Sequence, residues 1–266
     1  MNTYETPLIL FTVLSQLSIG IVAVSTLRQL AGPDIEPDKI RTEWMVASGA
    51  LLVGMIASIF HLGHPGGMVQ AINNLGTAWL SREALSTGIF LALLVAGVML
   101  MREKTNPGLI IVTALVGLLV IFSMGMTYSP PSFPAMNNVL PFVFFFITAM
   151  LLGAGVGILF ASDASRRMVS HILIVSLIVG LIVYLIVPCI WLSGGEVMRQ
   201  TGVQWLASPL YWGRIVIGLV LPLAIIWALK KTQAWLWVII LVGELLGRAE
   251  FFASTVHTAT NMGGMY

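Results

Sequence analysis

The chain has 266 residues, of which 58% are hydrophobic and 9% are charged. An ordinary soluble domain carries about 25% charged residues, so this composition excludes a soluble globular protein and indicates an integral membrane protein. The net charge of +2 gives no reason to expect nucleic acid as a partner. The single cysteine, Cys189, excludes a disulfide framework and a cysteine-ligated iron–sulfur cluster.

Eight apolar stretches each have about the 20 residues that a helix needs to cross a bilayer. None shows the period-2 alternation of an outer-membrane barrel strand, so we predict an all-α integral membrane protein with a bundle of eight transmembrane helices. We expect residues 1–266 to form a single transmembrane domain. In chain order the predicted helices cover about residues 7–27, 44–62, 82–101, 108–128, 140–161, 168–191, 212–229 and 235–256. Pro188 and Pro222 lie inside two of these helices and should kink them.

The basic residues of the loops predict the orientation of the bundle. Nine of them follow the first, third, fifth and seventh helices, whereas the opposite side has Arg82 and Arg199, with Arg214 just inside the seventh helix. Basic loops stay in the cytoplasm, so we predict that both termini lie on the outer (periplasmic) side of the membrane. The nine residues are Arg28, Lys39, Arg41, Arg102, Lys104, Arg166, Arg167, Lys230 and Lys231.

Charges at membrane depth are the best sequence evidence about function, because a charged side chain in hydrocarbon costs roughly 2.5–3.5 kcal/mol. Ser81 is a suitable N-cap for the third helix, and Glu83 would then lie in the first turn, near the outer surface. The plain interpretation is a helix-start carboxylate, paired with Arg82. In the functional interpretation, Glu83 accepts a proton at the outer edge of the membrane, and His61, at the end of the second helix, lies at the same depth. A carboxylate and an imidazole at one level can take the two protons of a quinol.

The eighth helix carries Glu244 and Arg248 four residues apart, which is the spacing of an intrahelical ion pair. Such a pair is either structural or a relay, and pairing lowers the membrane cost of both charges. Gln16 lies in the middle of the first helix and must find a polar partner. The sequence gives no role for Glu250, about one turn nearer the outside, or for His257.

Two other classes of protein stay open on the residues alone. A membrane cytochrome b needs axial histidines that face each other at matching depth. His171 has no histidine partner at its depth, which excludes two haems, but His61 and His257 lie near the outer ends of their helices and leave a single-haem cytochrome possible. The second alternative is a small transporter or channel that uses Glu244 and Arg248 as a relay, with the proline-kinked helices as moving parts.

Four motifs carry a resemblance to a known family. They are LILFTVLSQL near the start, HLGHP closing the second helix, WLSREALSTGIF opening the third and GELLGRAEFF in the eighth. Their order and placement resemble the anchor subunit family of dimethyl sulfoxide reductase over essentially the whole chain. The resemblance implies eight helices with outward termini in the bacterial inner membrane.

The resemblance also implies a function. The implied protein is a membrane anchor that oxidises menaquinol, as the quinol dehydrogenase subunit of an anaerobic respiratory oxidoreductase. It would carry no haem, iron–sulfur cluster or metal of its own. Electrons would pass to a ferredoxin-like subunit with four iron–sulfur clusters and on to a molybdopterin catalytic subunit. We expect no terminal reductase activity from this chain alone, and the terminal acceptor and the quinone species stay open.

Matching motifs carry the family's site onto this sequence. The carboxylate of its LSxE motif falls on Glu83 and the histidine of its HLGxP motif on His61, which implies that these two residues are catalytic. The GELxGR element falls on Glu244 and Arg248.

Four further residues are candidates for binding the quinone, namely Ser81, Arg82, His64 and Gln16. Arg82 replaces a neutral polar residue of the family pattern and His64 replaces a small one. These departures bear on quinone affinity.

The first prediction concerns topology. Reporters fused after Tyr266 and in the loop between the second and third helices should both report the outer side, because the nine basic residues lie on the other side. An alkaline phosphatase fusion, active only outside, measures this directly. A cytoplasmic signal from either fusion would contradict the orientation.

Overall fold

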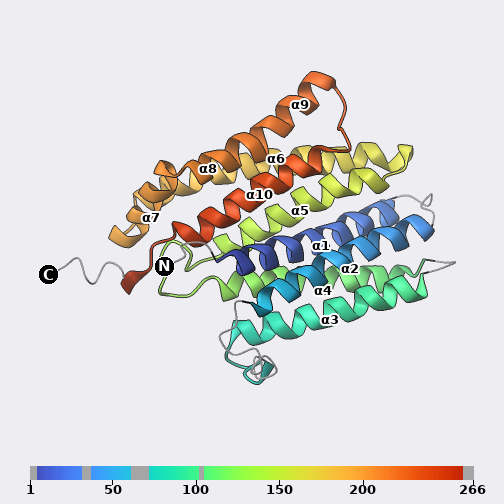
Figure 1. Ribbon diagram of the computed structural model, residues 1–266, viewed down its shortest axis with the longest axis horizontal. Helices are drawn as coiled ribbons and strands as arrows, with labels where there is room; N and C mark the ends of the chain where they lie inside the picture. The colour runs from blue at the N-terminus through green and yellow to red at the C-terminus, as the bar shows by residue number, and fades with distance from the viewer. Residues whose placement is uncertain (1–4, 32–36, 61–71, 102–104, 260–266) are drawn as a thin grey trace.

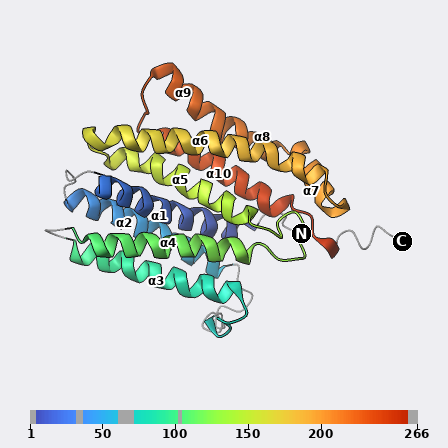
Figure 2. The ribbon, with the colours of Figure 1, turned by 180° about the vertical axis from the view of Figure 1, so that it is seen from behind.

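The computed structural model describes residues 5–31, 37–60, 72–101 and 105–259. Within these ranges the chain is helical and forms no strand. The long helices run side by side as a bundle, with α1 and α5 between the α2–α3–α4 side and the α6–α9 side (Figures 1 and 2). The elements are α1 (Thr6–Ala31), α2 (Pro37–Ile59), α3 (Trp79–Leu100), α4 (Pro107–Thr127), α5 (Leu140–Phe160), α6 (Asp163–Leu192), α7 (Glu196–Ala207), α8 (Pro209–Gly213), the π-helix η2 (Arg214–Val220), α9 (Leu221–Leu229) and α10 (Leu236–Ala253).

Each of the eight predicted ranges overlaps a helix of the structure. Helix α2 begins seven residues before the predicted position, and α7 is an additional short helix in a segment that we expected to be a loop. Seven helical segments in the described part of the chain are long and apolar enough to cross a membrane, with Pro209–Leu229 counted as one. Helix α10 is not among these seven, and it carries three charged residues in its 18.

The predicted seventh helix contains a change of helix type ahead of its proline. Residues Arg214–Val220 form a π-helix directly before Pro222. Proline has no N–H to donate to the preceding turn, and a π-turn is one way to accommodate the missing bond. The predicted irregularity at Pro222 therefore occurs as a local widening of the helix.

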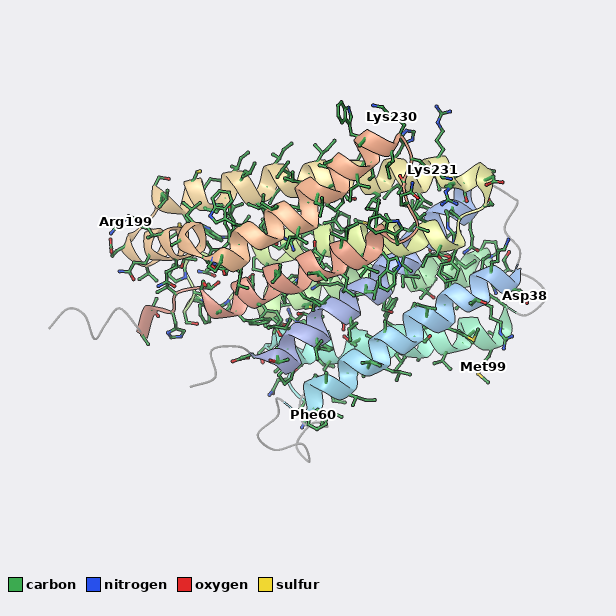
Figure 3. All side chains as sticks on the ribbon, turned by 45° about the horizontal axis from the view of Figure 1, so that its top comes forward. Asp38, Phe60, Met99, Arg199, Lys230 and Lys231 are labelled. Atoms are coloured by element: carbon green, nitrogen blue, oxygen red, sulfur yellow. The ribbon has the colours of Figure 1, made fainter. Side chains whose placement is uncertain are left out.

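The charges of the described residues are distributed unevenly between the two ends of the bundle. Lys230 and Lys231 lie at the same end as Asp38 and Met99, whereas Phe60 and Arg199 lie at the other (Figure 3). Helix α1 begins and α10 ends at the end that holds Arg199 (Figure 1). Following the predicted topology, we use the name outer end for the end of the bundle that holds Arg199.

Helix α1 lies at the centre of the bundle and packs closely on α5. A Cβ atom at Gly20 would overlap the carbonyl oxygen of Ala149, and one at Gly153 would overlap the backbone of Gly20. Small residues at such a crossing let two helix backbones approach, which is the main source of helix association in lipid. The close crossing keeps Gln16 and the outer half of α1 against α5.

The second prediction concerns this crossing. Gly20→Ala should lower the free energy of unfolding by about 1–3 kcal/mol, because the added methyl group forces the two backbones apart. Unfolding in mixed micelles measures the change. Gly49→Ala is the matched control, since nothing lies within 4 Å of a Cβ built there. A loss of stability in Gly49→Ala equal to that in Gly20→Ala would contradict the packing explanation.

Candidate functional site

Glu83 is a buried carboxylate near the outer end of α3. Its side chain is 3% exposed, and its Oε2 atom has no hydrogen-bond partner in the described part of the chain. One helical turn further along, Thr87 is also 3% exposed, and its hydroxyl likewise has no partner among the described residues. Glu83 and Thr87 thus present two buried polar groups, one turn apart on α3, that can form hydrogen bonds.

The last turn of α4 lies against Glu83. The Glu83 carboxyl group interacts with the Thr127 side chain, and the Thr127 hydroxyl donates to the carbonyl oxygen of Ser123 at 2.9 Å. Thr127 thus places a hydroxyl group next to the Glu83 carboxylate.

Tyr128 links Glu83 with the rest of the outer end. Its ring meets Phe145 and Phe252 edge-on, with centroids 5.7 and 5.4 Å apart. The phenol is close enough to both Glu83 and Glu5 to be affected by their charges. Glu5 is exposed just before α1, so Tyr128 is influenced by one buried and one exposed carboxylate.

The start of α3 differs from the prediction. The N-cap is Ala78, and Ser81 lies two residues beyond the first helical residue, so Ser81 does not cap the helix and Glu83 lies in the second turn. The reason is a turn that begins the helix early, in which the amides of Thr77 and Ala78 both donate to the carbonyl oxygen of Asn74. Glu83 is consequently more deeply placed than a capping residue would be.

Arg82 does not pair with its neighbour Glu83 in the structure. Its guanidinium donates to the carbonyl oxygens of Leu75 and Gly76, at 2.9 and 2.8 Å, and lies 4.2 Å from the centre of the Trp79 ring. Arg82 thus fixes the turn before α3. The other two residues of the predicted site, His61 and His64, lie outside the described residues.

A second group of buried polar side chains joins four helices. We call it the α10 cluster, and its members are Gln16, Thr148, Arg214, Glu244 and Arg248, all at most 4% exposed. Arg214 donates to Glu244 Oε2 at 2.6 Å, and Thr148 donates to the same oxygen at 2.6 Å. Arg248 donates to Gln16 Oε1 at 2.6 Å. The cluster therefore ties α1, α5 and η2 to α10.

The prediction that Glu244 forms an ion pair with Arg248 is wrong. Glu244 forms its salt bridge with Arg214 of η2, while Arg248 is directed to Gln16 on α1 and over the ring of Phe145 at 4.0 Å. Spacing along one helix could not show a partner that arrives from another helix. Thr148 stands between the two groups, since Arg248 also contacts its hydroxyl at 3.4 Å.

The glycines of the GELLGR motif make room for this cluster. The backbones of Gly243 and Gly218 approach so closely that a Cβ on Gly243 would overlap the other glycine. A Cβ on Gly247 would overlap the Arg214 side chain. The two glycines thus bring η2 and its arginine within reach of Glu244, and the guanidinium then lies 3.9 Å from the centre of the Tyr184 ring.

Two more buried carboxylates have local partners. Glu43 forms a fully buried ion pair with Arg28, whose guanidinium also donates to the carbonyl oxygen of Phe160 at 2.8 Å. Glu250 accepts from the hydroxyl of Ser208 at the junction of α7 and α8. Both contacts tie separate helical segments together, which is a structural role.

His257 packs edge-on against Phe133, with centroids 4.9 Å apart, and its Nδ1 accepts from the amide of Ala259 at 2.9 Å. Among the described residues, no three histidine, cysteine or carboxylate side chains gather as metal ligands.

Sequence reasoning missed five residues that shape these two groups, namely Thr87, Thr127, Tyr128, Thr148 and Arg214. Only Thr87 and Arg214 carried a usable signal. Thr87 is four residues from Glu83 and shares its helix face, and Arg214 is a charge inside an apolar stretch. Thr127, Tyr128 and Thr148 are ordinary residues in sequence and acquire their contacts through packing.

The fold and these buried charges define an all-helical, multi-pass membrane protein. A family model described as DMSO reductase anchor subunit (DmsC) matches residues 1–254. The chain belongs to that family, and it is a membrane anchor protein of the bacterial inner membrane.

Named relatives agree with the family. The chain is 29% identical over 276 residues to the C subunit of anaerobic dimethyl sulfoxide reductase from Escherichia coli, a match that covers 94% of each protein. It is 35% identical over 161 residues to the Haemophilus influenzae protein of the same name, and this match spans 58% of each protein.

The third prediction separates the observed ion pair from the expected one. Removing one partner of a buried ion pair should cost about 3–5 kcal/mol, because the other charge is left uncompensated. Glu244→Gln and Arg214→Met should therefore each lower the free energy of unfolding strongly, and their combination should cost much less than the sum. Unfolding in mixed micelles measures the coupling. The control is the double-mutant cycle between Glu244→Gln and Arg248→Met. If its coupling energy equals or exceeds that of the Glu244–Arg214 cycle, the ion pair expected from the sequence, Glu244 with Arg248, would be supported instead.

Proposed function

We propose that this chain is the menaquinol-oxidising anchor of a dimethyl sulfoxide reductase-like complex, with Glu83 as a proton acceptor. The observation that carries the proposal is the buried Glu83 carboxylate, whose Oε2 has no partner in the described part of the chain. A carboxylate buried in an apolar bundle would normally be ion-paired, as Glu244 is with Arg214, whereas no basic side chain among the described residues pairs with Glu83. A hydroxyl of a bound quinol would supply the missing partner and place its proton next to the acceptor.

The reaction needs two proton acceptors and one electron acceptor. Oxidation of a quinol to the quinone releases two protons and two electrons. Glu83 takes one proton, and the resemblance of the HLGHP motif assigns the second to His61. The two electrons pass to an iron–sulfur cluster of a ferredoxin-like subunit and then to a molybdopterin catalytic subunit. Both partners belong on the outer end, because Glu83 is there.

The proposal includes a route for the proton of Glu83 to the surface. The charges of Glu83 and of the exposed Glu5 both act on Tyr128, and its phenol can accept and donate hydrogen bonds in turn. We infer that protons leave along Thr127, Tyr128 and Glu5 to the periplasmic side. Proton release and electron exit then occur on the same side of the membrane.

The proposal includes eight membrane spans with both termini outside. Helix α10 is the eighth span, and its charges are compatible with that position because neighbouring helices cover all three. Of the quinone-binding candidates, Gln16 fits least as a direct ligand, since its amide is already engaged with Arg248 and with the sulfur of Met124. Met124 lies on the same turn of α4 as Thr127, so Gln16 supports the wall against which Glu83 lies.

The fourth prediction tests Glu83. Glu83→Gln keeps the shape of the side chain and removes the proton acceptor, so quinol-dependent reduction of the terminal acceptor should fall by about 100-fold or more, the range that general base catalysis contributes. Activity with an artificial donor that reduces the catalytic subunit directly should be retained. Steady-state rates with the two donors measure the difference.

Glu250→Gln is the matched control, since it makes the same change at a buried carboxylate of α10 that already has Ser208 as a partner. It should keep most quinol activity. Normal quinol turnover in Glu83→Gln would refute the proposal, and loss of activity with both donors would instead mean that Glu83 holds the complex together.

A further inference from the structure

A groove on the lipid-facing side of α5 and α6 has no place in the mechanism above. It has a volume of about 680 Å³, within the range of about 300–1,000 Å³ of small-molecule sites. Its walls are apolar and include Phe146, Met150, Val175 and Val179. The groove is remote from Glu83, because α6 and α3 lie on opposite sides of the bundle (Figures 1 and 2).

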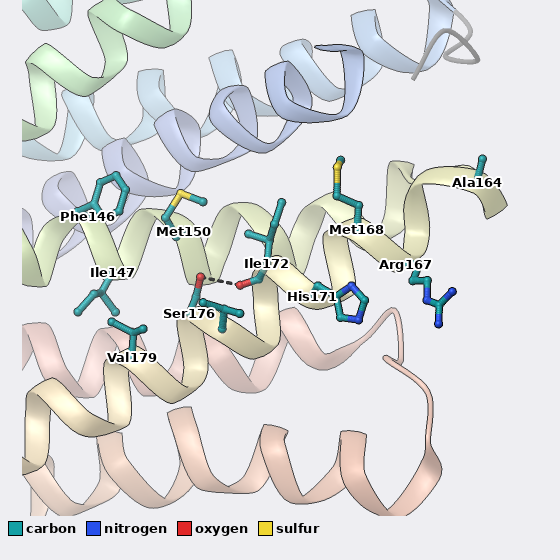
Figure 4. Close-up of a pocket in the computed structure, with 11 residues that line it drawn as sticks. Phe146, Ile147, Met150, Ala164, Arg167, Met168, His171, Ile172, Ser176 and Val179 are labelled. Carbon is teal, nitrogen blue, oxygen red and sulfur yellow. Dashed lines mark hydrogen bonds between the residues drawn. The ribbon is translucent and has the colours of Figure 1, made fainter. Parts of the chain in front are cut away.

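The groove is polar at one end only. Arg167 and His171 lie side by side there, while Phe146, Ile147 and Val179 lie toward the other end (Figure 4). The polar residue along the wall, Ser176, donates to the carbonyl oxygen of Ile172 at 2.8 Å and so offers no free hydrogen. A ligand that fits must therefore have one polar or charged head and a long apolar body.

The head that fits is an anion. Arg167 and His171 are both exposed, and neither forms a hydrogen bond or an ion pair with another described residue. Asp163 lies four residues before Arg167 on the same helix, but no ion pair forms between them. Both basic residues lie near the start of α6, at the basic end of the bundle. An arginine offers five donors to a phosphate, and a histidine ring offers at least one.

We propose that the groove between α5 and α6 is a binding site for an anionic phospholipid. Arg167 and His171 hold the phosphate, and one acyl chain lies along the apolar walls as far as Phe146. The site rests on the face of α6 that carries Arg167, His171, Val175 and Val179 at four-residue intervals, which places all four on one side of the helix. It is independent of the quinol reaction.

The test is lipid binding by the purified full-length chain in neutral detergent. Native mass spectrometry measures affinity for phosphatidylglycerol and for phosphatidylcholine with the same acyl chains. We expect tighter binding of phosphatidylglycerol, and Arg167→Gln should weaken it about fivefold, which is the effect of one basic residue near an anionic lipid surface. Arg167→Lys should retain most of the affinity because it keeps the charge.

Two further variants locate the site. Arg166→Gln removes the neighbouring charge, which does not line the groove, and should change the affinity by less than about twofold. Val179→Trp fills the apolar part and should weaken binding of both lipids. Equal affinity for the two lipids, or an equal loss in the Arg166 and Arg167 variants, would overturn the proposal, because binding would then reflect only hydrophobic contact or overall charge.

Discussion

A charge in the middle of a bilayer must be neutralised by the protein around it, and this bundle is organised by how its charges meet that requirement. Arg214 and Glu244 form a direct salt bridge, and Arg28 and Glu43 form another near the basic end. Each pair joins two different helices, α1 with α2 and η2 with α10, so the pairs act as cross-links that fix neighbouring helices in one register. The central helix α1 contributes Arg28 to the second ion pair, and its Gln16 accepts from Arg248 in the α10 cluster.

Glu83 differs from the carboxylates of these two ion pairs, because no basic side chain among the described residues pairs with it. Its Oε2 is buried without a partner among the described residues, and so is the hydroxyl of Thr87 one turn away. The α10 cluster supports this site indirectly, since Gln16 contacts Met124 on the turn of α4 that also provides Thr127 and Tyr128. The ion-paired groups give rigidity, and the carboxylate without a basic partner among the described residues is left as the reactive group. Rigid support around an incompletely satisfied acceptor is what a proton-accepting site requires.

Much of the fold could be predicted because membrane helices are defined by length and hydrophobicity. Each predicted helix overlaps an observed one, and the irregularity near Pro222 occurs as η2. The local start of α3 could not be predicted, because a turn around Asn74 displaced Ser81 from the cap.

The predicted partner of Glu244 was wrong for a related reason. Spacing along one helix reports only neighbours on that helix, whereas Arg214 reaches Glu244 across two close glycine contacts. Glu83 itself was found from the sequence, because a carboxylate stands out within an apolar stretch.

The most direct test of the central claim is the location of the bound quinone. A photoreactive menaquinone analogue, bound to the purified complex and activated by light, labels whatever lies against its ring, and peptide mapping by mass spectrometry finds the labelled residues. The account predicts label on the outer turns of α3 around Glu83 and Thr87 and on the end of α4 at Thr127 and Tyr128. Label confined to the groove between α5 and α6, with none on α3 or α4, would contradict it.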